Sequence, residues 1–205
     1  MFELFKAEVL RFRTLALALA GAHLLVLAFM TRVFDLAQQP LVVHWTIGGC
    51  HLAIGLLAGL YQMGTYRKAN VWLTLLHRPM PPHRVAIAIM LACVAALAVV
   101  VATPILLVAL WQDTMTARVV DLRHWLLALS GLQVATIGYL AGAQGMLGGV
   151  RRALAALPLL MLLPMASATG PGMLALQALC VLCLAAVVLA SFQPDLDAPP
   201  SHALA

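Results

Sequence analysis

The chain has 205 residues, of which 64% are hydrophobic and 9% are charged, and its formal net charge at pH 7 is +5. A soluble domain carries about 25% charged residues, so this composition excludes an ordinary soluble globular protein and favours a membrane protein. In lipid the backbone polar groups must be satisfied within the protein, and the alternation of a β-barrel is absent, so the sequence predicts an all-α, polytopic membrane helix bundle.

Residues 1–13 form the first predicted element, an amphipathic helix. Phe2, Phe5, Val9 and Phe12 recur at three- and four-residue spacing, so they share one helical face, while charged residues occupy the rest. We expect this helix to lie flat on the cytoplasmic leaflet. There it would act as a topological anchor in contact with membrane lipids, or as a contact for a partner protein.

Six long apolar stretches reach or approach the roughly 20 residues that a helix needs to cross the hydrocarbon, and they predict a six-helix transmembrane domain over residues 14–191. The predicted spans are Thr14–Phe34, Leu41–Thr65, Val85–Trp111, Trp125–Gly149, Ala153–Thr169 and Gly172–Ser191. The fifth is short and contains two prolines, so the last two spans could instead form a re-entrant pair. Residues 192–205 have little apolar content and predict a flexible cytoplasmic tail.

The distribution of Lys and Arg predicts the orientation, because these residues stay cytoplasmic in short loops. Nine of the twelve fall on one side of the predicted bundle: Lys6, Arg11, Arg13, Arg67, Lys68, Arg78, Arg84, Arg151 and Arg152. Trp45, Trp111 and Trp125 fall on the other side, and indoles favour the membrane interface. The sequence therefore predicts an inner-membrane protein with both termini in the cytoplasm. The cations are split among three segments without an aromatic platform, which argues against nucleic-acid binding.

The longest predicted cytoplasmic connection covers residues 66–84. Its apolar positions Val71, Trp72, Leu75 and Leu76 have helical spacing, and the prolines that follow would end such a helix before the third span. Most links between bundle helices have about two to eight residues. A longer link with its own apolar face indicates either a short helix that packs on a partner or a loop on the membrane surface.

This pattern resembles the permease subunits of ABC type-2 transporters. The shared features are a basic amphipathic helix before the first span and, later, a short helix, Leu-Leu, a basic residue, proline and a new span. Here the motif is Ala69–Pro79 (ANVWLTLLHRP), followed by Arg84-Val-Ala-Ile. The resemblance implies that the segment is a coupling helix that docks on a separate ABC ATP-binding subunit, and that two permease chains form a dimer. The implied partner-binding residues are Arg67, Lys68, Trp72, Leu75, Leu76, His77, Arg78 and Arg84.

The chain contains no G-x-x-x-x-G-K-[ST] sequence that could bind nucleotide phosphates, so ATP would be bound and hydrolysed by the partner. Paired carboxylates and nucleophile–base arrangements are also absent from the spans, so we predict a non-catalytic subunit. Pairs of glycines four residues apart predict close helix packing. These glycines are Gly55 with Gly59, Gly138 with Gly142, and Gly145 with Gly149.

Four histidines within or beside the spans suggest an alternative function. His23 and His51 fall near mid-membrane on antiparallel neighbouring spans, and His44 and His124 share an outer level. Paired imidazoles could ligate the iron of a haem b, which would make the chain a membrane redox protein. The other interpretation is that each histidine hydrogen-bonds across helices.

Overall fold

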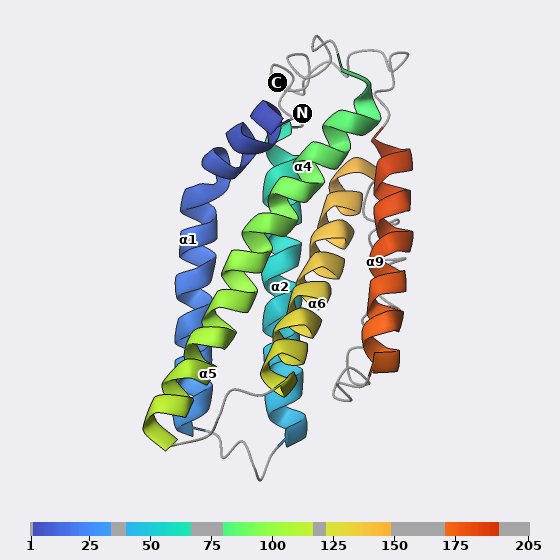
Figure 1. Cartoon of the computed structure of the whole chain (residues 1–205). Coiled ribbons are helices and arrows are strands. Elements are labelled where there is room, and N and C mark those ends of the chain that lie inside the picture. The colour runs from blue at the N-terminus through green and yellow to red at the C-terminus, as the bar shows by residue number, and fades with distance from the viewer. Residues whose placement is uncertain (1, 34–39, 67–79, 117–121, 149–170, 193–205) are drawn as a thin grey trace, which may run out of the picture.

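The computed structural model describes residues 2–33, 40–66, 80–116, 122–148 and 171–192. These residues form the helices α1 (Phe2–Val33), α2 (Pro40–Tyr66), α4 (Pro82–Leu97), α5 (Thr103–Thr116), α6 (Leu122–Gly148) and α9 (Pro171–Ser191). A π-helical turn, η1 (Ala98–Ala102), joins α4 directly to α5. The elongated bundle in Figure 1 confirms the predicted all-α membrane architecture, and no strand occurs in the described part of the chain.

Five helices in the described residues are long and apolar enough to cross a membrane. The prediction was six, and its fifth span, Ala153–Thr169, lies outside the described residues. The other five predicted spans coincide with α1, α2, the α4–η1–α5 unit, α6 and α9. The 21-residue α9 is a full-length candidate span, which favours the separate sixth span over a re-entrant pair.

Proline sets several helix boundaries. Helices α2, α4 and α9 begin at Pro40, Pro82 and Pro171, where the missing N–H costs nothing because the first turn of a helix has no partner for it. Helix α4 therefore begins three residues before the predicted start at Val85. The preceding Pro81 has an extended backbone, and its carbonyl accepts a hydrogen bond from the Arg84 N–H at 3.0 Å.

Helix α1 is continuous through residue 13, so the predicted boundary between an interfacial helix and the first span does not appear as a break. The predicted apolar face coincides only in part with the face that packs on the bundle, since Phe12 is buried and Phe5 and Val9 are half-buried. The residues of the first turns that pack against the bundle are Leu4, Glu8 and Phe12, whereas Phe2 is 73% exposed. These three positions are four residues apart and therefore share one face of the helix. The carboxylate of Glu8 lies on the packed face because Arg11 pairs with it there.

The relative directions of the helices follow from their contacts. Gly55 and Gly59 of α2 face Ala135 and Tyr139 of α6 in the same order, so α2 and α6 are parallel. Helices α6 and α9 are also parallel, because their two hydrogen-bonded pairs are each 47 residues apart. Helix α1 runs in the opposite direction to α2, and its residue His23 contacts Val100 in η1.

Phe2 and Ser191 consequently lie at the same end of the bundle, whereas Gly148 and Pro171 lie at opposite ends (Figure 1). We call the end that contains Phe2 the N-terminal end; Tyr66 and Pro82 also lie there. The other end is the tryptophan end, since Trp45, Trp111 and Trp125 lie near it. Each of these indoles is between 52% and 57% exposed, as expected for a band of interfacial aromatic residues.

Candidate functional site

The predicted coupling segment lies mostly outside the described residues, which exclude residues 67–79. The seven implied contact residues from Arg67 to Arg78 are among these, and only Arg84 is described. Arg84 is exposed in the first turn of α4. The structure does place the end of α2 and the start of α4, which flank the segment, at the N-terminal end of the bundle (Figure 1).

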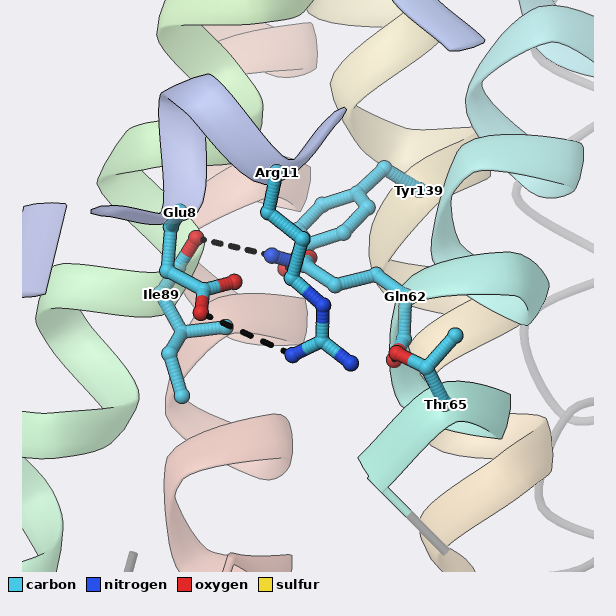
Figure 2. Close-up of polar contacts among 6 residues, drawn as sticks. All are labelled: Glu8, Arg11, Gln62, Thr65, Ile89 and Tyr139. Carbon is cyan, nitrogen blue, oxygen red and sulfur yellow. Dashed lines mark hydrogen bonds and ion pairs between the residues drawn. The ribbon is translucent and has the colours of Figure 1, made fainter. Parts of the chain in front are cut away.

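Helix α1 contributes a charged pair to this end, as Figure 2 shows. Arg11 Nη1 lies 3.8 Å from Glu8 Oε1, and the carboxylate side is largely buried, with Glu8 only 5% exposed. The guanidinium carbon of Arg11 lies 5.2 Å from the centroid of the Tyr66 ring and 5.6 Å from that of Phe12. These cation–π distances join the first turns of α1 to the last residue of α2.

One turn further into the bundle, Gln62 of α2 connects two other helices. Its Nε2 donates to the Ile89 carbonyl of α4 at 3.4 Å, and its Oε1 accepts a 2.8 Å hydrogen bond from the Tyr139 hydroxyl of α6 (Figure 2). Gln62 and Tyr139 are both essentially inaccessible. An amide with both functions occupied is a stable way to hold a polar side chain between helices in lipid.

The most unusual site is deeper, where His23 of α1 meets His51 of α2. The two Nε2 atoms are 3.0 Å apart, and the rings meet edge to face with centroids 4.8 Å apart. His23 Nδ1 is also 3.0 Å from the Val100 carbonyl oxygen in η1. The side chains are 0% and 2% exposed, so three helical elements enclose the pair.

Pro104 explains why the Val100 carbonyl is available. In a regular α-helix this carbonyl would accept from the N–H of residue 104, but proline has none, and its ring clashes with the carbonyl four residues earlier. The π-helical turn η1 accommodates this local defect. His23 then supplies a donor to a carbonyl that would otherwise lack its regular helical partner in an apolar environment.

The placement of this pair does not fit a haem held by two axial histidines. Each iron–imidazole bond is about 2 Å long, so axial nitrogens lie about 4 Å apart with the macrocycle between them. Here a 3.0 Å hydrogen bond joins the two nitrogens directly. His44 lies in α2 and His124 in α6, but their side chains lie outside the described set.

Four of the six predicted packing glycines meet at the α2–α6 interface. A Cβ on Gly55 or Gly59 would collide with the backbone of Ala135 or Tyr139, and one on Gly142 would lie 2.6 Å from the Leu56 carbonyl oxygen. Gly138 has an equivalent contact with Leu52. Gly145 belongs to α6, and Gly149 is outside the described residues. The glycines thus bring two helices of this same chain together.

Another glycine of α6 contacts the histidine pair directly. A Cβ on Gly131 would lie 2.7 Å from Cε1 and 2.8 Å from Nδ1 of His51. The backbone of α6 therefore closes the side of the His51 ring that faces away from His23. The sequence placed His23 and His51 at a common depth, but η1 and the contact with Gly131 were not predicted. Pro104 was the available signal for η1.

Comparison of the chain with protein-family models, with curated proteins and with solved structures found no match.

Proposed function

We propose that this chain is the membrane-spanning permease subunit of an ATP-driven transporter of the ABC type-2 class. The energy would come from a separate ATP-binding subunit that docks on the segment between α2 and α4. The motif in Ala69–Pro79 motivates this proposal, and the placement of the end of α2 and the start of α4 supports it. Both flanks lie at the N-terminal end, so a partner bound there could act on α2 and α4 together.

The charge distribution supports the same assignment. The cations Lys6, Arg11, Arg13 and Arg84 belong to the first turns of α1 and α4, at the end where the proposed docking segment begins. Under the positive-inside rule this end is cytoplasmic, which is where a nucleotide-binding subunit would find its ATP. We therefore propose that both termini are cytoplasmic and that the tryptophan end faces outward.

The contact of Arg11 with the Tyr66 ring offers a mechanical link. Any displacement of the segment after Tyr66 would act on α1 as well as on α2, because the charged pair of Glu8 and Arg11 packs at this point. A second permease chain would have to use other surfaces than the glycines of α2 and α6, which are already occupied within the chain. The largely apolar bundle suits a lipidic or amphipathic cargo.

Replacing the predicted anchor tests the docking proposal. In Trp72→Ala, co-purification of an ATP-binding subunit from native membranes should fall, because loss of a buried aromatic anchor costs about 2 kcal/mol or more, roughly a thirtyfold increase in Kd. Mass spectrometry should find that the subunit lost contains the G-x-x-x-x-G-K-[ST] sequence. Trp111→Ala, which removes a half-exposed indole at the opposite end, should leave recovery unchanged.

Reporters fused after residue 205 and inserted near Thr116 check membrane insertion in the same strains. The first should report from the cytoplasm and the second from outside, in wild type and in Trp72→Ala alike. If wild type recovers no ATP-binding subunit, or if Trp72→Ala recovers as much as wild type, the coupling assignment is wrong.

A further inference from the structure

We propose that His23 and His51 form a binding site for a single proton in the interior of the bundle, reached from the N-terminal end. Ionisable side chains inside membrane spans are costly, and they commonly mark proton or ion pathways. The proposal is independent of the permease assignment, because it rests on the geometry around these two rings.

The neighbours of the rings determine where the hydrogens lie. The Val100 carbonyl can only accept, so His23 Nδ1 must carry a hydrogen and donate it. In the neutral tautomer His23 Nε2 is then a bare acceptor, and His51 Nε2 must donate across the 3.0 Å contact. The remaining nitrogen, His51 Nδ1, is left without a hydrogen in the neutral pair.

This arrangement accepts one proton without breaking a hydrogen bond. Protonation of His51 Nδ1 leaves both the contact between the rings and the contact with Val100 intact. A second proton would have to go to His23 Nε2, and two N–H groups would then face each other 3.0 Å apart. The geometry therefore limits the pair to one positive charge while the rings stay together.

Polar groups lie on the same helix faces as the pair, toward the N-terminal end. On α2, Tyr66, Gln62 and His51 are four and eleven residues apart, so they lie on one face, and Glu8 and His23 share the corresponding face of α1. Between Gln62 and Val100 lies a cavity of about 20 Å³ that is lined by both residues and by Leu19. That volume has room for about one water molecule, and Gln62 contributes the polar side chain of an otherwise largely apolar lining.

The opposite direction is closed by apolar side chains. Beyond the pair, toward the tryptophan end, the described buried residues of the adjoining helices include Leu27 and Met30 of α1, Ile105 of α5 and Ala128 of α6. None of these side chains can donate a hydrogen bond, and the sulfur of Met30 is at most a weak acceptor. A proton would therefore enter and leave from the N-terminal end, which makes the site one-sided.

The helices around the histidine pair have no Asp, Glu, Lys or Arg near the level of the two rings. Asp, Glu, Lys and Arg are absent from 14–31, 41–66, 85–112 and 124–150. The other titratable groups on these elements are Cys50, Tyr61 and Tyr66 of α2, Cys93 of α4 and Tyr139 of α6, with His44 and His124 toward the tryptophan end. Glu8 is 15 residues from His23, about 22 Å along the helix, so the described residues place no counter-ion beside the bound proton. Uptake consequently requires acidic conditions.

Solid-state NMR of the full chain, labelled with ¹⁵N-histidine and held in lipid bilayers, tests the proposal across a range from about pH 8 to about pH 4. At the high end, one Nδ1–H ring should vanish in His23→Gln and one Nε2–H ring should vanish in His51→Gln. The two Nε2 nuclei should show a coupling across the hydrogen bond. On acidification, the His51 ring should gain a second hydrogen while His23 keeps one bare nitrogen.

Two variants complete the experiment. His83→Gln removes an exposed histidine in the first turn of α4 and should leave the signals of the pair unchanged. Gln62→Leu removes the polar step beside the cavity and should slow proton exchange at His51 without loss of the coupling between the rings. The site is refuted if both rings become doubly protonated while coupled, if both stay neutral until the protein unfolds, or if no coupling is found in wild type. Unchanged exchange in Gln62→Leu would refute the route.

Discussion

Helix α2 meets its neighbours through two faces of different construction. Toward α6 it presents Gly55 and Gly59, and the two backbones come so close that no Cβ would fit. Toward α1 and α4 it presents His51 and Gln62, which hydrogen-bond to His23 and to the Ile89 carbonyl, and the Gln62 amide also accepts a hydrogen bond from Tyr139 of α6. The glycine face has one possible arrangement, whereas the polar face can change its protonation or exchange its partners. A rigid α2–α6 pair therefore forms the frame against which α1 and α4 could move.

The largest expected effect comes from Gly59→Leu. Overpacking costs about 1–3 kcal/mol where neighbouring side chains can give way, but here the obstacle is the backbone of Tyr139, so we expect a loss at or above the upper limit. Unfolding in a denaturing detergent, followed by circular dichroism, measures the change. Gly21→Leu is the matched control, because a Cβ at Gly21 of α1 has open space. Equal stability of the two variants would show that the α2–α6 contact is not the rigid frame.

A smaller loss is expected on the polar face. His51→Ala leaves His23 Nε2 without its donor, and an unsatisfied buried polar group costs about 1–3 kcal/mol. His23→Ala also removes the donor to Val100, so it should be the more damaging of the two. A double-mutant cycle isolates the interaction between the rings, and additive single effects would contradict the hydrogen bond. The same purified wild type should show no Soret absorption after incubation with haem b. A stoichiometric band that is lost in either variant would restore the redox alternative.

The helices were predictable because each depends on a local apolar run, and the directions of α1 and α2 follow from alternate crossing of the membrane. Sequence also placed His23 and His51 at one depth. It could not show that Glu8 would lie against the bundle, because its side chain becomes tolerable there only through Arg11, Tyr66 and their neighbours. Helical spacing alone grouped Phe2 with Phe5, Val9 and Phe12, but it could not show that Leu4 would be buried against the bundle while Phe2 is exposed.

The parallel arrangement of α6 and α9 was equally beyond the sequence. Nothing in the sequence indicates that Ser130 pairs with Gln177. The constant separation of 47 residues is seen only when this hydrogen bond is compared with the one between Gln144 and Ser191. Pro104 is an intermediate case. A proline within the third span predicts a missing helical hydrogen bond there. It does not predict that His23 of α1 would donate to the Val100 carbonyl.

The smallest effect is expected at the α6–α9 interface, which has neither tight backbone contact nor a titratable pair in the described residues. The Ser130 hydroxyl donates to Gln177 Oε1 at 3.2 Å, and both side chains are buried. Hydrogen bonds between transmembrane helices average about 0.6 kcal/mol in double-mutant cycles, because each partner finds other groups when the helices separate. The cycle of Ser130→Ala and Gln177→Leu should therefore give a coupling near that value, well below the cost of Gly59→Leu.

The second pair of this interface provides an internal comparison. Gln144 Nε2 donates to the Ser191 hydroxyl at 3.1 Å, in a partly buried position at the N-terminal end. Ser191 is partly exposed, so water can replace Gln144 as its partner, and the cycle of Gln144→Leu and Ser191→Ala should show a weaker coupling than the cycle at Ser130. Both cycles can be measured by the unfolding assay used for Gly59→Leu. A coupling at Gln144 that equals or exceeds the one at Ser130 would mean that the N-terminal end of α9 is as dry as its middle.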